Sequence, residues 1–323
     1  MRGAWSRSTR RAAERFGGAL VETEHHGTIR EPPQHSVMEP TEINDDPEPW
    51  WGTVSLDEGS GGRWDVGPST LWLYRSANEW RLFCRLPSDP AAVDPMLNRS
   101  QRIVPLPAPD LAELLEATDD RLQVSRYSFR RTEAPISLQP ALADRPVVSR
   151  PEHPLFVPPE ESVTLYLSTP LWVRIELAES ERRLQDVPSF RMSDTWFGAS
   201  TVEGELCYAT RTAGRLRLDN LPRRYHRAVT PLRIKNMATD ALALERVQLP
   251  VQHLALYTTP SNQLWTQAVT MTRSEGREGA GVQIRGGPPA DAKGAKRIQE
   301  PREASKKGLF MSTFSAVGTL FGS

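Results

Sequence analysis

Short runs of alternating apolar and polar residues, separated by turns and prolines, are the feature of this sequence that most restricts its fold. In the run 80–86 every second residue is apolar, and the residues between them include two arginines. That period of two is typical of a half-buried β-strand. A second run, 69–74, precedes it across the polar segment 75–79. The two runs predict a β-hairpin.

The same rhythm continues to about residue 271. Further runs predict strands over 122–131, 136–138, 163–167, 172–177, 204–210, 215–218, 228–235, 241–251, 254–257 and 264–271. Prolines before such runs suit edge strands, where a missing N–H is harmless. The pattern contains no crossover helices of the kind that a parallel α/β fold needs. The fold class is therefore predicted to be mainly β, an antiparallel β-sandwich built as one or two Ig-like or jelly-roll-like sandwiches.

One short internal helix is expected near residue 110. Asp110 can cap it and Glu113 can reciprocate, while Leu111, Leu114 and Leu115 form an inward stripe. The helix is expected to end near 118–120.

Composition shifts divide the chain. We predict a disordered extension over 1–37, a β-rich region with one helix over 38–134, a β-sandwich over 135–274, a disordered linker over 275–307 and an amphipathic helix over 308–323. The Arg-rich, acid-poor start also fits an organellar transit peptide, or a start assigned ahead of Met38. Residues 275–307 hold almost no large apolar groups, which is typical of a disordered segment.

The last segment carries four apolar side chains at steps of four, three and four: Phe310, Phe314, Val317 and Phe321. This spacing places them on one face of a helix, too short to cross a bilayer. An exposed apolar face of this kind needs a cover. We therefore expect a helix detached from the body that binds a protein partner or a membrane surface.

Net charge excludes two classes of protein. Lys and Arg total 40 and Asp and Glu total 40, so the chain is neither an overall basic nucleic-acid binder nor an acidic, solvating chain. No nucleic-acid partner is expected. No run of 18 apolar residues is present, and without a secretory signal the protein is predicted to be cytoplasmic. The oligomeric state stays open.

No motif indicates a reaction. Phosphate-binding loops, zinc signatures and redox cysteine pairs are absent from the sequence, and the six histidines show no ligand spacing. We predict no catalytic, metal or cofactor-binding residue and no cofactor. Cys84 and Cys207 are expected to be reduced thiols on inward-facing strand positions.

Two groups of side chains are candidates for a ligand or anion surface. Trp196 lies between polar residues and Gly198, so it is a candidate for an exposed loop, whereas tryptophans such as Trp50 and Trp51 more commonly plug the ends of a sandwich. The arginine-rich segment 211–227 supplies the second group: Arg215, Arg217, Arg223 and Arg224. A stripe of arginines can bind phosphate or an acidic surface, although a solvated face paired with carboxylates is the commoner outcome.

Several stretches carry a family resemblance: 64–68, 80–82, 146–148, 165–173, 193–198 and 204–209. Together they resemble bacterial members of the uncharacterised family called domain of unknown function 432, over roughly residues 50–272. The resemblance implies no activity and no site residue. It implies a partner at the membrane, such as a small mechanosensitive channel.

Three classes of function follow. The first is a non-catalytic cytoplasmic accessory protein that acts through its C-terminal helix. The second is a carbohydrate- or small-ligand-binding β-sandwich module, which requires exposed tryptophan on a concave surface. The third is a hydrolase, which requires two carboxylates, or a nucleophile and a base, to meet in a cleft.

Overall fold

The computed structural model describes residues 48–87, 100–117, 119–150, 155–180, 182–198, 204–211, 214–275 and 279–304, with the backbone of 309–311 and 314–315. All of the described residues belong to one compact unit, residues 45–323. The predicted extension over 1–37 lies outside the described residues.

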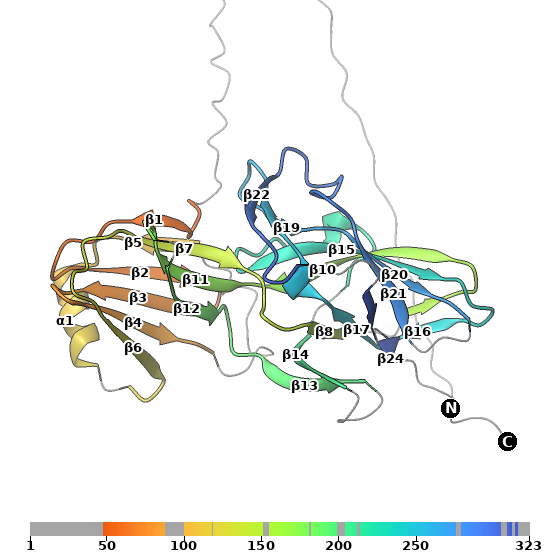
Figure 1. The fold of residues 1–323 in the computed structure, drawn as a ribbon, viewed down its shortest axis with the longest axis horizontal. Helices are drawn as coiled ribbons and strands as arrows, with labels where there is room; N and C mark the ends of the chain where they lie inside the picture. The colour runs from red at the N-terminus through yellow and green to blue at the C-terminus, as the bar shows by residue number, and fades with distance from the viewer. Residues whose placement is uncertain are drawn as a thin grey trace, which may run out of the picture. The chain divides into compact units, whose positions relative to one another are not determined.

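The first layer is a five-stranded antiparallel sheet (Figure 1). From edge to edge it contains β5 (Ser100–Ile103), β2 (Gly61–Val66), β3 (Ser69–Arg75), β4 (Glu79–Arg85) and β6 (Leu122–Ser128). β3 and β4 pair from Thr70 with Arg85 to Arg75 with Trp80, which confirms the predicted hairpin. Gly67, at φ +59°, makes the tight turn between β2 and β3.

A four-stranded antiparallel sheet shares its core with this layer. It contains, in order, β1 (Gly52–Val54), β7 (Ile136–Ala141), β11 (Trp172–Leu177) and β12 (Arg182–Pro188). Trp64, Trp80 and Leu82 of the first sheet belong to one buried cluster, and Ile136 and Leu138 of β7 belong to it too. Two sheets that bury their facing side chains in one cluster are typical of a β-sandwich.

A second core joins the remaining sheets. The eight-stranded sheet runs β22 (Lys296–Gln299), β18 (Leu256–Thr258), β19 (Leu264–Thr266), β15 (Arg227–Asn236), β20 (Val269–Arg273), β21 (Ala280–Ile284) and β23 (Leu309–Met311), with β10 (Ser162–Pro170) also paired to β15. The five-stranded partner runs β13 (Ser193–Phe197), β14 (Glu205–Arg211), β8 (Val147–Arg150), β17 (Arg246–Leu249) and β24 (Phe314–Ser315). A separate two-stranded sheet, β9 (Leu155–Val157) with β16 (Leu242–Leu244), also contributes side chains to this second core. Leu165, Leu232 and Val247 from these sheets lie in one buried cluster.

Three connections carry the chain between the two cores: β7 to β8, β10 to β11, and β12 to β13. Only Leu171 separates β10 from β11, and its backbone N–H donates to the carbonyl of His226 at 3.1 Å. Ser69 Oγ donates to the carbonyl of Ser189 at 2.6 Å. We call this region, where the strands pass from one core to the other, the junction.

The mainly β class is confirmed, with corrections in detail. Three pairings are parallel, β8 with β14, β15 with β19 and β15 with β20, so the described sheets are not purely antiparallel. The first core also takes β7, β11 and β12, so residue 134 does not separate two independent cores. The predicted strand 215–218 is a single bridge at Arg215 followed by a 3-10 turn, η3 (Leu218–Asn220).

The one α-helix in the described part of the chain, α1 (Ala108–Glu116), covers the outer face of the first sheet through Leu114, beside Trp72 and Phe83. Its position confirms the predicted helix. The predicted cap is wrong, because Pro107 occupies the N-cap and Asp110 lies in the first turn of the helix. Leu115, which was expected to face inward, is exposed. Besides η3, the described residues contain a second 3-10 turn, η4 (Val251–His253). No described helix has the length and apolar character needed to cross a membrane.

The C-terminal predictions are wrong for the described residues. β21 and β22 lie within the predicted linker, because short alternating runs such as 280–284 find neighbours in a sheet that already exists. The predicted helix is replaced at 309–311 and 314–315 by β23 and β24, which pair with β21 and β17. The unpaired backbone groups at two sheet edges form hydrogen bonds with these residues as strands. A short isolated helix is only marginally stable in water, so pairing with the sheets is favoured. The rest of 308–323 lies outside the described residues.

Both cysteines confirm their prediction. Cys84 and Cys207 are free and buried. Burial raises the pKa of the Cys84 thiol to about 12. Burial, with the nearby Glu205 carboxylate, raises the pKa of Cys207 to about 11.

Candidate functional site

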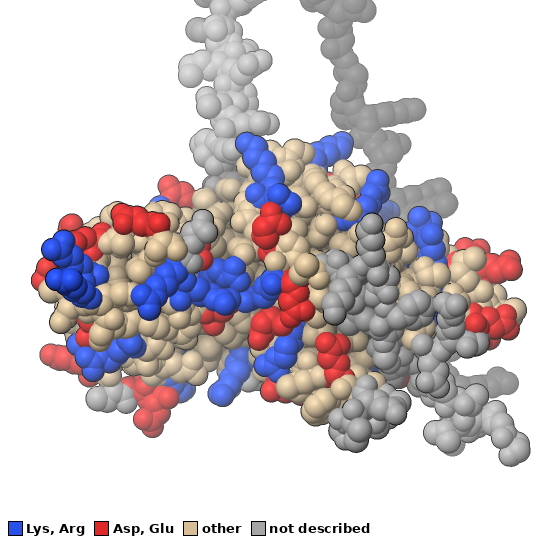
Figure 2. Space-filling model, in the orientation of Figure 1, with Lys and Arg blue, Asp and Glu red and all other residues tan. Residues whose placement is uncertain are grey.

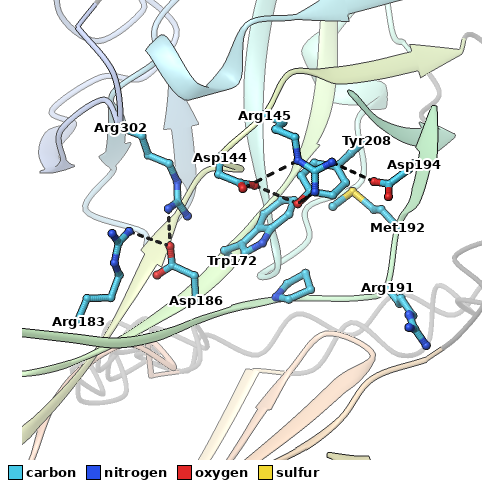
Figure 3. A pocket seen from close by; sticks show the side chains of 11 residues that line it. Asp144, Arg145, Trp172, Arg183, Asp186, Arg191, Met192, Asp194, Tyr208 and Arg302 are labelled. Atoms are coloured by element: carbon cyan, nitrogen blue, oxygen red, sulfur yellow. Dashed lines mark hydrogen bonds and ion pairs between the residues drawn. The ribbon is translucent and has the colours of Figure 1, made fainter. Parts of the chain in front are cut away.

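A polar cleft of about 560 Å³ opens at the junction (Figure 3). It is lined by Asp144, Arg145, Trp172, Arg183, Asp186, Pro188, Arg191, Met192, Asp194, Tyr208 and Arg302. Its walls come from the β7–β8 and β12–β13 connections, from strands β11 to β14 and from the segment after β22. We call this space the junction cleft.

Asp186, near the end of β12, accepts from three arginines. Arg174 Nε donates to its Oδ1 at 3.3 Å, Arg183 Nη1 donates to its Oδ2 at 3.4 Å, and Arg302 donates to the same oxygen. Arg302 also donates from Nε to the carbonyl of Leu142 at 2.6 Å. Burial raises the pKa of Asp186, but Arg302 and then Arg174 outweigh it and hold the pKa below its usual value.

A second cluster surrounds Tyr208 on β14. Arg145 lies over its ring, with the guanidinium carbon 4.3 Å from the ring centroid, and donates to its hydroxyl at 2.9 Å. The hydroxyl donates to Asp144 at 3.0 Å, while Arg145 also donates to Asp194 at 3.3 Å. Figure 3 shows Asp144 and Asp194 reaching toward Arg145 from different segments. The ring of Trp172 lies 5.2 Å from that of Tyr208, so one side of the cleft is aromatic.

A neighbouring hollow of about 640 Å³ shares Asp144, Arg183 and Arg302 with the cleft. It adds Arg174 and three carboxylates, Glu176, Glu300 and Glu303. Taken together, the two hollows are lined by five arginines and six carboxylates. Figure 2 shows blue and red side chains next to one another across the middle of the face it presents. The lining of the two hollows therefore offers both donors and acceptors, with little net charge.

This arrangement favours binding over proton transfer. A general acid needs a carboxyl group whose pKa is raised toward neutrality. The pKa of Asp186 is lowered instead, since its arginine partners stabilise the carboxylate. Among the described residues, no three His, Cys, Asp or Glu side chains are grouped to hold a metal ion.

Trp196 lies on strand β13 and is exposed at 48%. The prediction that it is exposed is confirmed, although it lies on a strand and not on a loop. Asp194 pairs with Tyr208, and Trp196 pairs with Leu206. Cross-strand partners share a face of a sheet, so Trp196 lies on the face that lines the cleft, one pleat beyond Asp194.

The candidate arginines have separate partners. Arg215 is half-buried, Arg217 pairs with Asp219 at 3.6 Å, and Arg223 donates to the carbonyl of Ser261. Arg224 lies near His226, whose pKa it lowers. Because 215–218 is not a strand, Arg215 and Arg217 do not share a strand face as predicted. Binding of an anion by any of them stays a prediction.

The remaining candidates fall elsewhere. Trp50 is fully buried and its ring meets Trp51 edge-on at 5.5 Å, as expected for residues that plug a core. Phe310 and Phe314 lie on β23 and β24, while Val317 and Phe321 lie outside the described residues.

Sequence analysis missed the residues of the junction cleft. Asp144, Arg145, Asp186, Tyr208 and Arg302 come from separate segments with no fixed spacing. The convergence of carboxylates that a hydrolase would require does occur here, but no local pattern signals it. By composition alone, Arg302 falls within the predicted disordered linker over 275–307. The one available signal is charge within Pro-bounded turns, as in 144–146 and 301–303.

A family model described as "Protein of unknown function (DUF432)" matches residues 50–318. The match confirms the resemblance and extends it past residue 302, so the segment that carries Arg302 lies within it. No curated protein and no solved structure matches the chain.

Proposed function

The chain belongs to the Protein of unknown function (DUF432) family, and from this premise we propose that it is a non-catalytic binding protein that holds a small hydrophilic ligand in the junction cleft. The observation that carries the proposal is the convergence of Asp144, Arg145, Asp186 and Arg302 in one cavity beside Tyr208.

The size and rigidity of the cleft support this function. A volume of about 560 Å³ falls in the range of small-molecule sites, roughly 300–1,000 Å³. Arg145 and Asp186 are each held by hydrogen bonds to other side chains, so their positions are fixed before a ligand arrives. Preorganised polar groups lower the entropic cost of binding.

A hydrolase is the weaker alternative. Three aspartates line the cleft, yet Asp186 and Asp194 each accept from an arginine and Asp144 accepts from Tyr208. The arginine partners of Asp186 hold its pKa below its usual value, so its ionised form accepts hydrogen bonds from a ligand but does not donate a proton to a leaving group.

An accessory role with a protein or a membrane partner stays a separate prediction, as does a cytoplasmic location. The described contacts of 309–311 and 314–315 are strand pairings within the same chain. They support a structural role for these residues.

Binding is tested by thermal shift against a panel of monosaccharides, amino acids, organic acids and nucleotides. A ligand that binds only the folded state raises Tm with concentration. Arg145→Gln removes the donor to both Asp194 and Tyr208, and loss of a charged hydrogen bond of about 1.5–3 kcal/mol predicts at least a tenfold loss of affinity.

The matched control is Arg217→Gln, since Arg217 forms an exposed ion pair outside the cleft. The proposal fails if no compound in the panel shifts Tm, or if the two variants lose affinity equally.

A further inference from the structure

We propose that the ligand is an uncharged saccharide of two or more rings, with one ring in the junction cleft and the next on the face of Trp196. This inference rests on the proposed function and names the class of its ligand. It follows from three observations: the position of Trp196, the balance of charge, and the presence of both donors and acceptors.

Trp196 extends the wall of the cleft. It follows Asp194 by two residues on β13, so both side chains project from the same face, about 7 Å apart along the strand. Its cross-strand partner, Leu206, is half-buried, so an apolar side chain lies beside the indole ring. A ligand that leaves the cleft along β13 therefore meets an indole ring.

The exposure of Trp196 distinguishes it from four other tryptophans of the chain. Trp50, Trp64, Trp80 and Trp265 are fully or almost fully buried, whereas Trp196 is 48% exposed. An exposed tryptophan beside a polar cavity is typical of recognition sites, because the ring offers a rigid apolar face with little loss of side-chain entropy. The C–H face of a sugar ring is a suitable partner for such a surface.

Charge balance argues against strongly charged ligands. Five arginines and six carboxylates line the two hollows, so they leave a difference of one negative charge. Nucleotides and polyphosphates select sites with excess arginine or lysine, and cations select sites with excess carboxylate. The near balance seen here fits a ligand without net charge.

Each hydroxyl group of a sugar both donates and accepts a hydrogen bond. The cleft offers both kinds of partner at short spacing: Asp194 and Arg145 are 3.3 Å apart, and Asp186 lies between Arg183 and Arg302. Asp144 and Asp194 remain 55% and 60% exposed in their side chains, so their free lone pairs can receive sugar hydroxyls. Adjacent hydroxyls of one ring can thus pair with an aspartate and an arginine together.

The test uses the full chain on an array of neutral and acidic glycans, followed by calorimetric titration with the neutral gluco-, xylo- and N-acetylglucosamine oligomers of one to six rings. We expect neutral oligomers to bind. Trp196→Ala should weaken the oligomers about tenfold and leave the single-ring sugar unchanged, since loss of one stacked ring removes one contact. The matched control is Phe156→Ala, an exposed aromatic on β9, at 64% exposure, which should change neither.

The outcomes separate the two proposals. Binding of a nucleotide or organic acid, weakened by Arg145→Gln, would overturn the saccharide class and leave the cleft function in place. Equal affinity of wild type and Trp196→Ala for all oligomers would overturn the subsite on Trp196. No binding to any glycan on the array would overturn the saccharide inference, and no binding to the wider panel would overturn the cleft function as well.

Discussion

Two ionisable side chains near the junction, the half-buried Asp186 and the buried His226, lie in opposite surroundings. Asp186 accepts hydrogen bonds from Arg174, Arg183 and Arg302. His226 is 1% exposed, and neither of its ring nitrogens has a hydrogen-bond partner among the described residues. The charged groups that act on its pKa, Arg224 and Arg227, are both cations.

The difference shows how the same kind of enclosure can favour either charge state. Arginine partners keep Asp186 charged despite burial, and its pKa is lowered. Burial, followed by Arg227 and Arg224, lowers the pKa of His226 to about 3, so the imidazole is neutral. Asp186 lines the junction cleft, while His226 fills space against Gly67 and Phe190.

Asp186→Asn should have the largest effect on stability. The amide keeps the shape of the carboxylate but removes the charge that compensates Arg174 and Arg302, whose side chains are 15% and 11% exposed. Leaving charges buried without their partner costs about 3–4 kcal/mol. Urea unfolding measures the loss. Asp219→Asn, at an 81% exposed partner of Arg217, is the control and should cost below about 1 kcal/mol. Equal losses of unfolding free energy in the two variants would mean that Asp186 is no more important to stability than an exposed ion-pair partner.

Gly67→Ala tests the packing of His226. A β-carbon at this position would lie 2.2 Å from Nδ1 of the imidazole, and the backbone is left-handed at φ +59°. Strain and overpacking together should cost about 2–3 kcal/mol in the free energy of unfolding. Gly59→Ala is the matched control, because its φ is +78° with nothing within 4 Å of the new carbon, and it should cost about 1 kcal/mol. Equal losses of stability in the two variants would contradict the prediction, because they would mean that His226 moves away from the methyl group at no cost.

Stability should fall as pH drops below the ordinary histidine value of 6.5 toward about 3. In that window the unfolded chain binds a proton at His226 and the folded chain does not, so stability is retained above pH 6.5 and lost below it. The loss is limited to about 1.4 kcal/mol per pH unit, or about 2 kcal/mol between pH 6.5 and 5. Asp186, with its pKa lowered from 3.8, adds to the loss only below that value.

The measurement is urea unfolding at several pH values, for wild type and His226→Phe. The phenyl ring keeps the packing against Phe190 and cannot be protonated. A wild-type slope that persists in the variant would show that other groups cause the acid sensitivity.

Arg302→Lys should have the smallest effect on stability. Arg302 donates to both the carbonyl of Leu142 and Asp186, whereas lysine keeps the charge but cannot donate from two fixed positions. We expect a loss of about 1 kcal/mol by thermal or urea unfolding. Arg217→Lys, at an exposed pair, should change stability by less than about 0.5 kcal/mol. If Arg302→Lys leaves stability unchanged, the positive charge alone is enough to hold the segment after β22 at the cleft.

The hairpin over 69–86 shows what local pattern can predict. Alternation places Leu71 and Leu73 of β3 in one core with Leu82 and Cys84 of β4, and all four are buried as expected. The exposure of Trp196 is also predictable, since polar neighbours and a glycine surround it. The C-terminal predictions failed because 280–284 and 309–311 become strands only when β20 and β21 offer their edges.

The mainly β class, the first hairpin, the position of α1 and the burial of both cysteines follow from local pattern, because each depends on the period of apolar residues within a few neighbours. That Asp144, Asp186, Tyr208 and Arg302 share one cleft follows from the folded arrangement of the strands and from no local pattern. They meet because three connections pass between two cores and bring together segments as much as 160 residues apart, as the bond from Arg302 to Leu142 shows. Side-chain pairing over such separations depends on strand order and register, and no local spacing encodes either.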